Sequence, residues 1–579
     1  WLCAAPDGRH ARLCDAPGDG WRLTVYRAGF TTPAWFRTGV MYQIFPDRFA
    51  RDSSATAQRG MEHHRRMGQT VHCHAGWDEP VEWQANTPES AYAPVDFYGG
   101  TLRGIADRLH YLQKLGVTVL YLNPIFESAS NHRYDTGDYR KVDPILGTNT
   151  DFKKLCAAAA DCGIRIVLDG VFAHTGADSR YFNRFRHYPG CGAYNSRSSV
   201  YARWYSFAHY PDDYKCWWDF KDLPAVNAAN PDWRKYMITG ERSIVKTWLR
   251  DGASGWRLDV ADELPDDVLR GMRSAAKETD PDSVLLGEVW EDAVTKVSYG
   301  ERRQYALGDA LDSVMNYPLR DGLVAFLTGR STAHALADLL LSQRLNYPRP
   351  LYYALMNLTA SHDVARTRSA LALDFDPRSR TRAELAALEI TDAMAARGAQ
   401  LQVLAAAVQF WLPGIPSIYY GDETGMQGLC DPFNRAPLQM CDTQMLQWYA
   451  QLTALRHAHP ALTRGEVAVF APAGDVLCVL RVIADGRDAF GEEAEDEALL
   501  LIVNRAAHPV RCHVELTCPG AGLCEETRLA FVRSEYDCAA DCTDDTHIAI
   551  RDGVGAFDLP PYAAKIYRLE NRHGTETGS

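Results

Sequence analysis

The segment Gly255-Trp256-Arg257-Leu258-Asp259 is a short apolar run that ends in a carboxylate. It follows Trp233–Leu249, which has helical periodicity, and precedes a second apolar run, Val284–Leu286. The same alternation recurs through most of the chain. The expected strands are Val40–Phe45, Val117–Leu122, Ile164–Leu168, Gly255–Leu258, Val284–Leu286, Val314–Asn316, Tyr353–Asn357 and Ile415–Tyr420. Eight strands that alternate with helices predict an α/β protein with a (β/α)8 TIM barrel, over residues 36–462.

Two departures from this repeat predict further domains. Roughly 60 residues, about 174–231, separate the third strand from the next helix, and so long an insertion is often functional. After residue 462 short β runs replace the helical pattern, and these are Val467–Phe470, Val476–Val482, Leu499–Val503, Cys512–Leu516 and Ala563–Leu569. They predict a C-terminal antiparallel β-sandwich over 463–572, followed by a polar tail, 573–579.

Residues 1–35 are expected to be a linker or the remnant of an N-terminal β domain, because Trp21–Tyr26 alternates like a strand but is too short to fold alone. The sequence opens without an initiating Met or a signal peptide, and most of its 15 Cys are expected to be reduced. We therefore expect a cytoplasmic protein, with an extracellular location left open. One group of cysteines is denser than the rest and could form a disulfide: Cys512, Cys518, Cys524, Cys538 and Cys542.

The charge balance argues against two classes of partner. The chain of 579 residues carries 61 Lys and Arg against 74 Asp and Glu, a formal net charge of −13. A protein that neutralises the phosphates of nucleic acid needs the opposite balance, as does one that docks on anionic lipid. The sequence also has no run of about 20 apolar residues that would span a bilayer. We therefore expect neither nucleic acid nor a membrane as a partner.

Polar side chains end several of the expected strands, where a (β/α)8 barrel has its active site. Arg257 and Asp259 alternate onto the same face, so Arg257 is expected to keep Asp259 ionised and oriented. Glu288, after the next strand, would act as an acid if burial raised its pKa. Taken singly, each residue has a structural explanation as an ion pair or a solvated strand end. Together with Asp363 they predict the cleavage of an acetal, which uses paired carboxylates.

Three other clusters are interpreted as structural. His63, His64, His72, Cys73 and His74 fit no common zinc spacing, so we expect no metal there. The run Arg378–Arg382 is interpreted as a solvated helix start rather than a nucleic-acid patch. Gly421-Asp422-Glu423 is interpreted as a structural turn whose acidic side chains lie near the site.

With these motifs in this order, the sequence resembles the α-amylase family of glycoside hydrolases. Within that family it is most similar to the branch of neopullulanases, cyclomaltodextrinases and maltogenic amylases. The matching segments are Met41–Phe49, Ser130–Asp135, Asp169–His174, Gly255–Asp259, Gly287–Trp290, His362–Asp363, Gly414–Glu423 and Asp431–Arg435. The resemblance covers most of the chain, and it is specific because the motifs recur at matching strand ends.

The resemblance implies a retaining mechanism with three catalytic carboxylates. Asp259 is the expected nucleophile, Glu288 the general acid and then the general base, and Asp363 the carboxylate that binds the distorted sugar. The residues expected to bind substrate are Tyr134, Asp169, His174, Arg257, Trp290, His362 and Arg435. A retaining enzyme holds its two reacting carboxyl groups about 5–5.5 Å apart.

Three departures from the family pattern bear on ligands and assembly. Ala173 stands where calcium-binding members have Asn, so calcium is left open, and no cofactor or metal is expected to be required. Asp262 replaces an Asn near the acceptor subsites, which leaves the preference for pullulan open. The N-terminal β domain that often forms the dimer in this branch is reduced or absent, so we expect a monomer if that domain is missing.

We therefore expect a retaining hydrolase of α-1,4 glucosidic bonds, with α-1,6 bonds left open. Its expected substrates are maltooligosaccharides, cyclodextrins, starch or pullulan. A glucanotransferase on the same scaffold is the main alternative, because the two reactions differ only in whether water or a sugar is the acceptor. A non-catalytic glucan-binding protein is the second alternative, which the three filled carboxylate positions disfavour.

Overall fold

The computed structural model describes residues 2–4, 11–16, 23–84, 92–516, 527–531, 548–550 and 553–571. Eight parallel strands form its central sheet, in the order β16-β13-β12-β9-β6-β3-β18-β17, and a bridge between Met315 and Met356 joins the two edges. The strands are β3 (Met41–Ile44), β6 (Val119–Leu122), β9 (Arg165–Gly170), β12 (Gly255–Leu258), β13 (Val284–Gly287), β16 (Ser313–Val314), β17 (Met356–Leu358) and β18 (Ile415–Tyr419). The predicted (β/α)8 barrel is confirmed.

Strand alternation explains why the barrel is a packed core. Met41 and Val119 point into the interior cluster, whereas their neighbours Tyr42 and Leu120 pack against the surrounding helices. All four side chains are fully buried. The near-continuous apolar strands of the sequence are therefore those of a parallel sheet that is covered on both faces.

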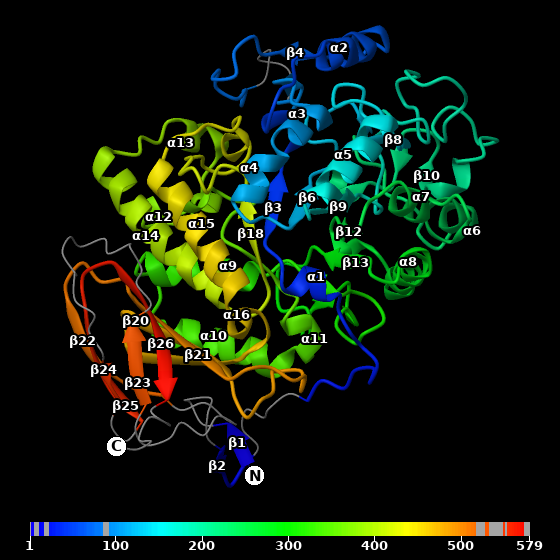
Figure 1. Cartoon of the computed structure of the whole chain (residues 1–579). Helices are drawn as coiled ribbons and strands as arrows, with labels where there is room; N and C mark the ends of the chain where they lie inside the picture. The colour runs from blue at the N-terminus through cyan, green and yellow to red at the C-terminus, as the bar shows by residue number, and fades with distance from the viewer. Residues whose placement is uncertain are drawn as a thin grey trace.

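Helices surround the barrel (Figure 1). The main ones are α3 (Leu102–Asp107), α4 (Leu109–Lys114), α5 (Asn149–Asp161), α7 (Ile244–Arg250), α8 (Asp266–Thr279), α9 (Tyr317–Leu327), α10 (Ala333–Asn346), α14 (Asp392–Trp411) and α15 (Thr443–Ala458). Two expected helices are interrupted. The segment 102–115 breaks at Arg108, and 233–249 contains a π-helix (Lys235–Thr239) before Ser243 starts α7 by accepting a hydrogen bond from the Lys246 N–H.

Three segments rise from the carboxyl end of the barrel. The first includes α2 (Thr56–Arg66) and pairs β4 (His72–Cys73) with β5 (Asp96–Phe97), at the top of Figure 1. The second is the hairpin of β7 (Phe126–Ser128) and β8 (Thr136–Val142). The third is the long insertion after β9, which carries the short pair β10 (Phe207–His209) and β11 (Asp213–Tyr214).

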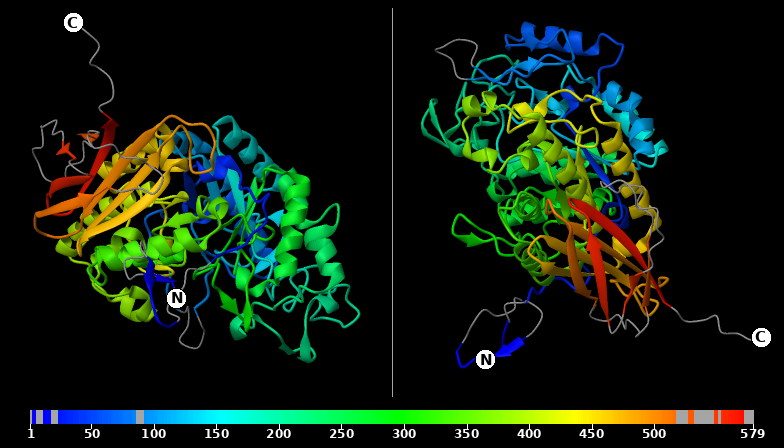
Figure 2. Two further views of the ribbon diagram at one scale, coloured as in Figure 1. Left: turned by 90° about the horizontal axis from the view of Figure 1, so that it is seen from below. Right: turned by 90° about the vertical axis from the view of Figure 1, so that its left-hand side faces the viewer.

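The C-terminal region forms two antiparallel layers against one side of the barrel (Figure 2). The larger sheet has the order β19-β20-β21-β26-β23-β24, and β22 (Val510–Glu515) pairs with β25 (Val554–Leu559) in the smaller one. The larger sheet comprises β19 (Glu466–Ala473), β20 (Val476–Ile483), β21 (Glu497–Asn504), β23 (Thr527–Phe531), β24 (Ile548–Ala549) and β26 (Ala563–Asn571). Leu480 and Ile502 of one layer meet Val514 and Phe557 of the other in a shared core, as in the predicted sandwich.

Alternate side chains of β20 and β21 face the barrel, and they attach the C-terminal region to it. Val479 and Leu501 belong to the core shared with the barrel helices, and the indole N–H of Trp411 in α14 donates to the Val479 carbonyl at 3.0 Å. The larger sheet is therefore buried on both faces. Cys512 is a buried free thiol, whereas the other four cysteines of the expected disulfide group, and the tail 573–579, lie outside the described residues.

The expected strand Trp21–Tyr26 is wrong for the part that the structure describes. Leu23–Tyr26 is irregular, with Leu23 86% and Val25 76% exposed, and no strand among the described residues pairs with it. The hydroxyl of Thr24 instead donates to the Asn346 carbonyl of the barrel at 2.7 Å. Within the described ranges, no helix is both long and apolar enough to cross a bilayer.

Candidate active site

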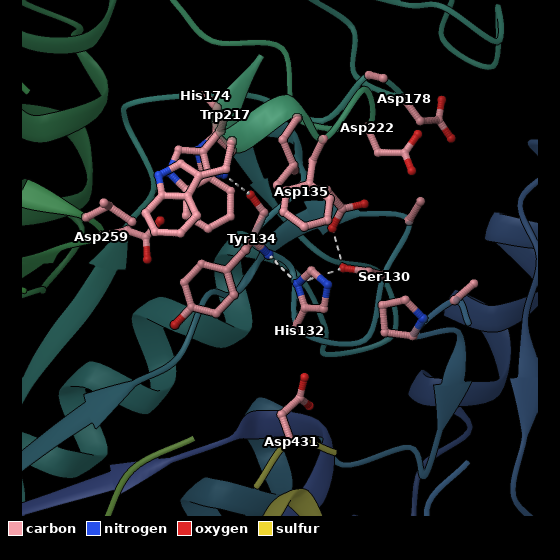
Figure 3. Close-up of a pocket in the computed structure, with 18 of the residues that line it drawn as sticks. Ser130, His132, Tyr134, Asp135, His174, Asp178, Trp217, Asp222, Asp259 and Asp431 are labelled. Carbon is pink, nitrogen blue, oxygen red and sulfur yellow. Dashed lines mark hydrogen bonds between the residues drawn. The ribbon is translucent and has the colours of Figure 1, made fainter. Parts of the chain in front are cut away.

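A cavity of about 980 Å³ opens above the carboxyl ends of the barrel strands. Its wall includes Asp259, Glu288 and Asp363, which follow three different strands. All three rising segments contribute to the wall, and Figure 3 shows Tyr134, His174 and Trp217 gathered near Asp259. The cavity is thus where a barrel of this type places its chemistry.

Arg257 connects the acidic groups beneath this cavity. One of its terminal nitrogens lies 2.8 Å from Asp169 and 2.9 Å from Asp259, and the other lies 2.9 Å from Glu288. Arg257 is fully buried, and Asp169 is 1% exposed. We call Arg257, Asp169, Asp259 and Glu288 the carboxylate floor.

Strand register produces this arrangement. In β9 and β12, Asp169 pairs directly with Arg257, and the Asp259 N–H donates to the Gly170 carbonyl at 3.1 Å. The Glu288 N–H likewise donates to the Leu258 carbonyl at 3.0 Å. The side chains of the floor are therefore positioned by the ladder of the barrel and not by flexible loops.

Val260 adds a strained residue directly after Asp259. Its φ is 41°, in the left-handed region that is unusual for a β-branched residue. The N–H of the same residue donates to Glu288 Oε2 at 2.8 Å. On the other side of the carboxylate, the indole N–H of Trp290 donates to Glu288 Oε1 at 3.0 Å. Glu288 is thus held from three directions.

A hydrogen-bond chain fixes the protonation of His362. The side-chain N–H of Gln43 donates to His362 Nδ1 at 2.9 Å, so the proton of the neutral ring lies on Nε2. Nε2 faces the hydroxyl of Tyr134, which donates to Asp169 Oδ2 at 2.8 Å. The rings of Tyr134 and His362 lie nearly parallel, with centroids 5.3 Å apart. Burial lowers the pKa of His362 well below its usual value, and the ring is neutral.

Asp363 pairs with Arg435 and also lies next to His362, whose Nε2 is 3.2 Å from Asp363 Oδ1. The two charged groups are 4.0 Å apart, and the Arg435 Nε–H donates to the His362 carbonyl at 3.0 Å. Arg435 also pairs with Asp431 at 2.9 Å. Burial, with the nearby charge of Glu288, raises the pKa of Asp363 to about 7.

Burial dominates the ionisation of the nucleophile candidate as well. It raises the pKa of Asp259 well above its usual range, although Arg257 acts in the opposite direction. The expectation that Arg257 keeps Asp259 ionised therefore omitted the larger effect, which is desolvation. Burial also lowers the pKa of His174 to about 4.

The structure gathers the ten site residues expected from sequence, but in two tiers. The wall of the cavity contains Asp259, Glu288, Asp363, Tyr134, His174, Trp290, His362 and Arg435. Asp169 and Arg257 lie beneath the wall, so they support the wall residues and do not line the cavity. Sequence reasoning missed Gln43 and Val260. Gln43 had a signal, because it is a lone amide within an apolar strand.

The competing clusters have structural partners. His64 contacts Asp143 at 3.2 Å, and His74 contacts Asp96 at 3.2 Å, so the histidines do not converge. Across the described ranges, no three His, Cys, Asp or Glu side chains gather as metal ligands. Glu423 is fully buried and accepts hydrogen bonds from Tyr42, so this turn is structural and is not part of the cavity wall.

The position expected to distinguish calcium-binding members offers no ligand. Ala173 has no side-chain oxygen, and its carbonyl accepts a hydrogen bond from the Val226 N–H at 3.0 Å. Calcium prefers several oxygen ligands at one point. The residues at Ala173 therefore do not fit a calcium site there.

Fold and site together define a (β/α)8 barrel with a carboxylate-lined cavity of the kind used for glycosyl chemistry. The family model of the α-amylase catalytic domain matches residues 43–440. The chain belongs to the α-amylase family of glycoside hydrolases.

Two curated relatives and one solved structure show where the chain lies within the family. An amylopullulanase of Thermoanaerobacterium saccharolyticum is 35% identical over 552 residues, which are 88% of this chain and 41% of that protein. A cyclomaltodextrinase of Geobacillus thermopakistaniensis is 32% identical, covering 94% of this chain and 79% of that protein. A cyclic α-maltosyl-(1→6)-maltose hydrolase of Arthrobacter globiformis is 26% identical with a TM-score of 0.69, covering 93% and 100%.

These matches confirm the predicted likeness to the cyclomaltodextrinase branch. They also extend it to amylopullulanases, which the motifs did not single out. The chain spans about two fifths of the length of the amylopullulanase that it matches.

Proposed function

We propose that the protein is a retaining α-glucan hydrolase that cleaves α-1,4 glucosidic bonds and forms a covalent glucosyl intermediate. The observation that carries this proposal is the single guanidinium of Arg257 in contact with both Asp259 and Glu288 at the cavity wall. Membership of the α-amylase family supports it. One buried cation contacts both carboxyl groups, and a retaining mechanism needs the two groups close together.

Each carboxyl group has one role in the proposed reaction. Glu288 donates a proton to the glycosidic oxygen while an Asp259 oxygen attacks the anomeric carbon, and the leaving chain departs as an alcohol. Glu288 then takes a proton from water, the resulting hydroxide attacks the same carbon, and Asp259 is released. Two inversions retain the α-configuration. Asp363 accepts hydrogen bonds from hydroxyl groups of the reacting sugar as it distorts.

The wall residues position the sugar for this reaction. Tyr134 offers a flat ring to the sugar, and the neutral His362 lies parallel to that ring with its Nε2–H directed at the Tyr134 hydroxyl. Asp169 and Arg257 keep these groups oriented from below. No step in this scheme uses a metal or cofactor, and activity that survives EDTA would support that part of the proposal.

The proposed substrates are maltooligosaccharides, cyclodextrins, starch and pullulan, and the names of the relatives support pullulan and cyclodextrin. Product analysis on pullulan, with starch and β-cyclodextrin alongside, tests the proposal. Panose from pullulan identifies α-1,4 cleavage, and maltotriose identifies α-1,6 cleavage. Longer products formed at high sugar concentration would identify a glucanotransferase instead. No reaction with any of the three substrates contradicts the hydrolase.

A further inference from the structure

Three aromatic side chains of the insertion extend from the active-site cavity toward solvent. Trp217, Trp218 and Phe220 all line the cavity, and we call them the aromatic track. Trp218 is 72% and Phe220 58% exposed, whereas most of the aromatic side chains that the structure describes are buried. An exposed apolar group beside an active site is more often a binding surface than a part of the core.

The track is a continuous stack that begins at the catalytic cavity. The ring of His174 lies 5.7 Å from that of Trp217, and the planes are 30° apart. Trp218 stacks on Trp217 at 5.6 Å and 28°, and Phe220 stacks on Trp217 at 5.9 Å and 24°. His174 itself contacts the Tyr134 carbonyl at 3.2 Å. Figure 3 shows Trp217 and His174 stacked beside Asp259, so the track starts where the reacting sugar is expected.

The backbone holds the track in a strained conformation. Trp218 and Asp219 both have positive φ, 46° and 63°, although neither is glycine. The loop is closed by hydrogen bonds from the Trp217 N–H to the Leu223 carbonyl and from the Phe220 N–H to the Trp217 carbonyl, each 2.9 Å. This short closed loop keeps the Trp218 ring on the outside. Hydrophobic burial would favour the opposite placement, so the exposed position calls for a ligand.

The cavity chemistry indicates which ligand fits. A pyranose ring has C–H groups on its faces and hydroxyl groups at its edges, so it covers an aromatic ring while its edges stay solvated. A peptide or lipid would need a wider apolar surface than three rings, and nucleic acid would need positive charge. A glucan chain that continues from the reacting sugar reaches the track without leaving the cavity.

We propose that the aromatic track binds the glucan chain beyond the reacting sugar, with Trp218 as its outermost contact. The inference rests on the proposed α-glucan hydrolase activity and adds that the enzyme prefers chains long enough to reach Trp218. A substrate confined to the reacting sugar and its neighbour gains nothing from the track. Discrimination by chain length then lies in the insertion and not in the carboxylate floor.

Kinetics on two substrates test the proposal. Trp218→Ala is expected to raise KM for maltoheptaose about fivefold while changing KM for 4-nitrophenyl α-maltoside less than twofold. Trp218→Phe keeps a ring and should restore most of the loss. Val200→Ala is the control, because Val200 lies in the same insertion, is 79% exposed and does not line the cavity.

Each outcome separates the two proposals. If the unaltered enzyme cleaves neither substrate, the hydrolase proposal fails. If it cleaves both, and Trp218→Ala changes the two KM values by the same factor or by none, the aromatic track is overturned. Titration of Asp259→Asn with maltoheptaose, followed by tryptophan fluorescence, gives a second readout, in which Trp218→Ala should weaken binding by a similar factor.

Discussion

The carboxylate floor lies at the base of the cavity and the aromatic track lines its wall, yet the two are built in opposite ways. The floor lies on strand ends that the barrel holds in register, and its charged groups are almost completely buried. The track lies on a loop, is largely exposed, and is held by stacking and a few backbone hydrogen bonds. Bond cleavage needs fixed charges in a dry site, whereas chain binding needs accessible apolar area.

The difference also concerns stability. Burying Arg257 with three carboxyl groups carries a large desolvation cost, which their mutual contacts offset. The exposed rings of the track carry no such cost, and their removal leaves no unpaired charge. Substitutions in the floor should therefore affect both chemistry and folding, and those in the track should affect binding alone.

The largest effect is expected at Asp259. Asp259→Asn keeps the size of the side chain but removes the nucleophile, so turnover on maltoheptaose should fall by about 10⁴-fold or more. Release of reducing ends measures the loss, and an unchanged circular dichroism spectrum shows that the fold is kept. Activity within tenfold of the unaltered enzyme would place the nucleophile elsewhere.

Glu288→Gln should separate proton donation from attack. Turnover of maltoheptaose should fall about 10³-fold, because the leaving alcohol needs a proton. α-Maltosyl fluoride, whose fluoride leaves without protonation, should lose less than about tenfold in the first step. Equal losses on the two substrates would argue against Glu288 as the acid.

Arg257→Met tests whether the floor depends on its one cation. The change leaves three carboxyl groups without their partner and should lower the free energy of unfolding by about 3–5 kcal/mol, measured by urea denaturation. Arg27→Met is the matched control, because Arg27 pairs with Asp309 at a side chain that is 68% exposed. That pair should contribute less than about 1 kcal/mol. Similar losses in both variants would contradict the proposed role of burial.

Asp363→Asn should increase stability while it reduces activity. The pKa of Asp363 is about 7 in the folded protein and close to 4 in an unfolded chain, so the folded state retains the proton longer. Native stability therefore falls as the pH rises through this window. The variant avoids that loss and should be about 1–2 kcal/mol more stable at pH 8, with no gain near pH 4. Thermal unfolding at the two pH values measures the difference, and a gain that is independent of pH would exclude this explanation.

The sequence was informative about the floor for a physical reason. Alternation along a strand places Arg257 and Asp259 on one face, and the ends of parallel strands meet at one edge, so Glu288 and Asp363 could be placed with them. This placement follows from the positions of the residues along the strands and requires no knowledge of side-chain contacts. Desolvation was harder to anticipate, because it depends on everything packed around Asp259 and not on one neighbour.

Neither the aromatic track nor the positive φ of Val260 could be predicted in this way. The insertion was recognised as long and aromatic, but nothing in its periodicity distinguishes Trp218, which is exposed, from Trp204, which is buried. The sequence does not indicate the positive φ of Val260 either, since valine is among the residues least expected in that region. At Leu23–Tyr26 the sequence instead suggested a strand that the structure does not contain, because alternation predicts a strand only where a partner strand is present.

The neutral state of His362 has a consequence for inhibitor design. An iminosugar that mimics the reacting sugar carries a positive charge, and it would meet Asp259, Glu288 and Asp363 with no imidazolium to repel it. Such a cation would also displace the proton that Asp363 holds below about pH 7. Its affinity should therefore rise as the pH increases toward 7, and calorimetry in buffers of different ionisation enthalpy should register the released proton.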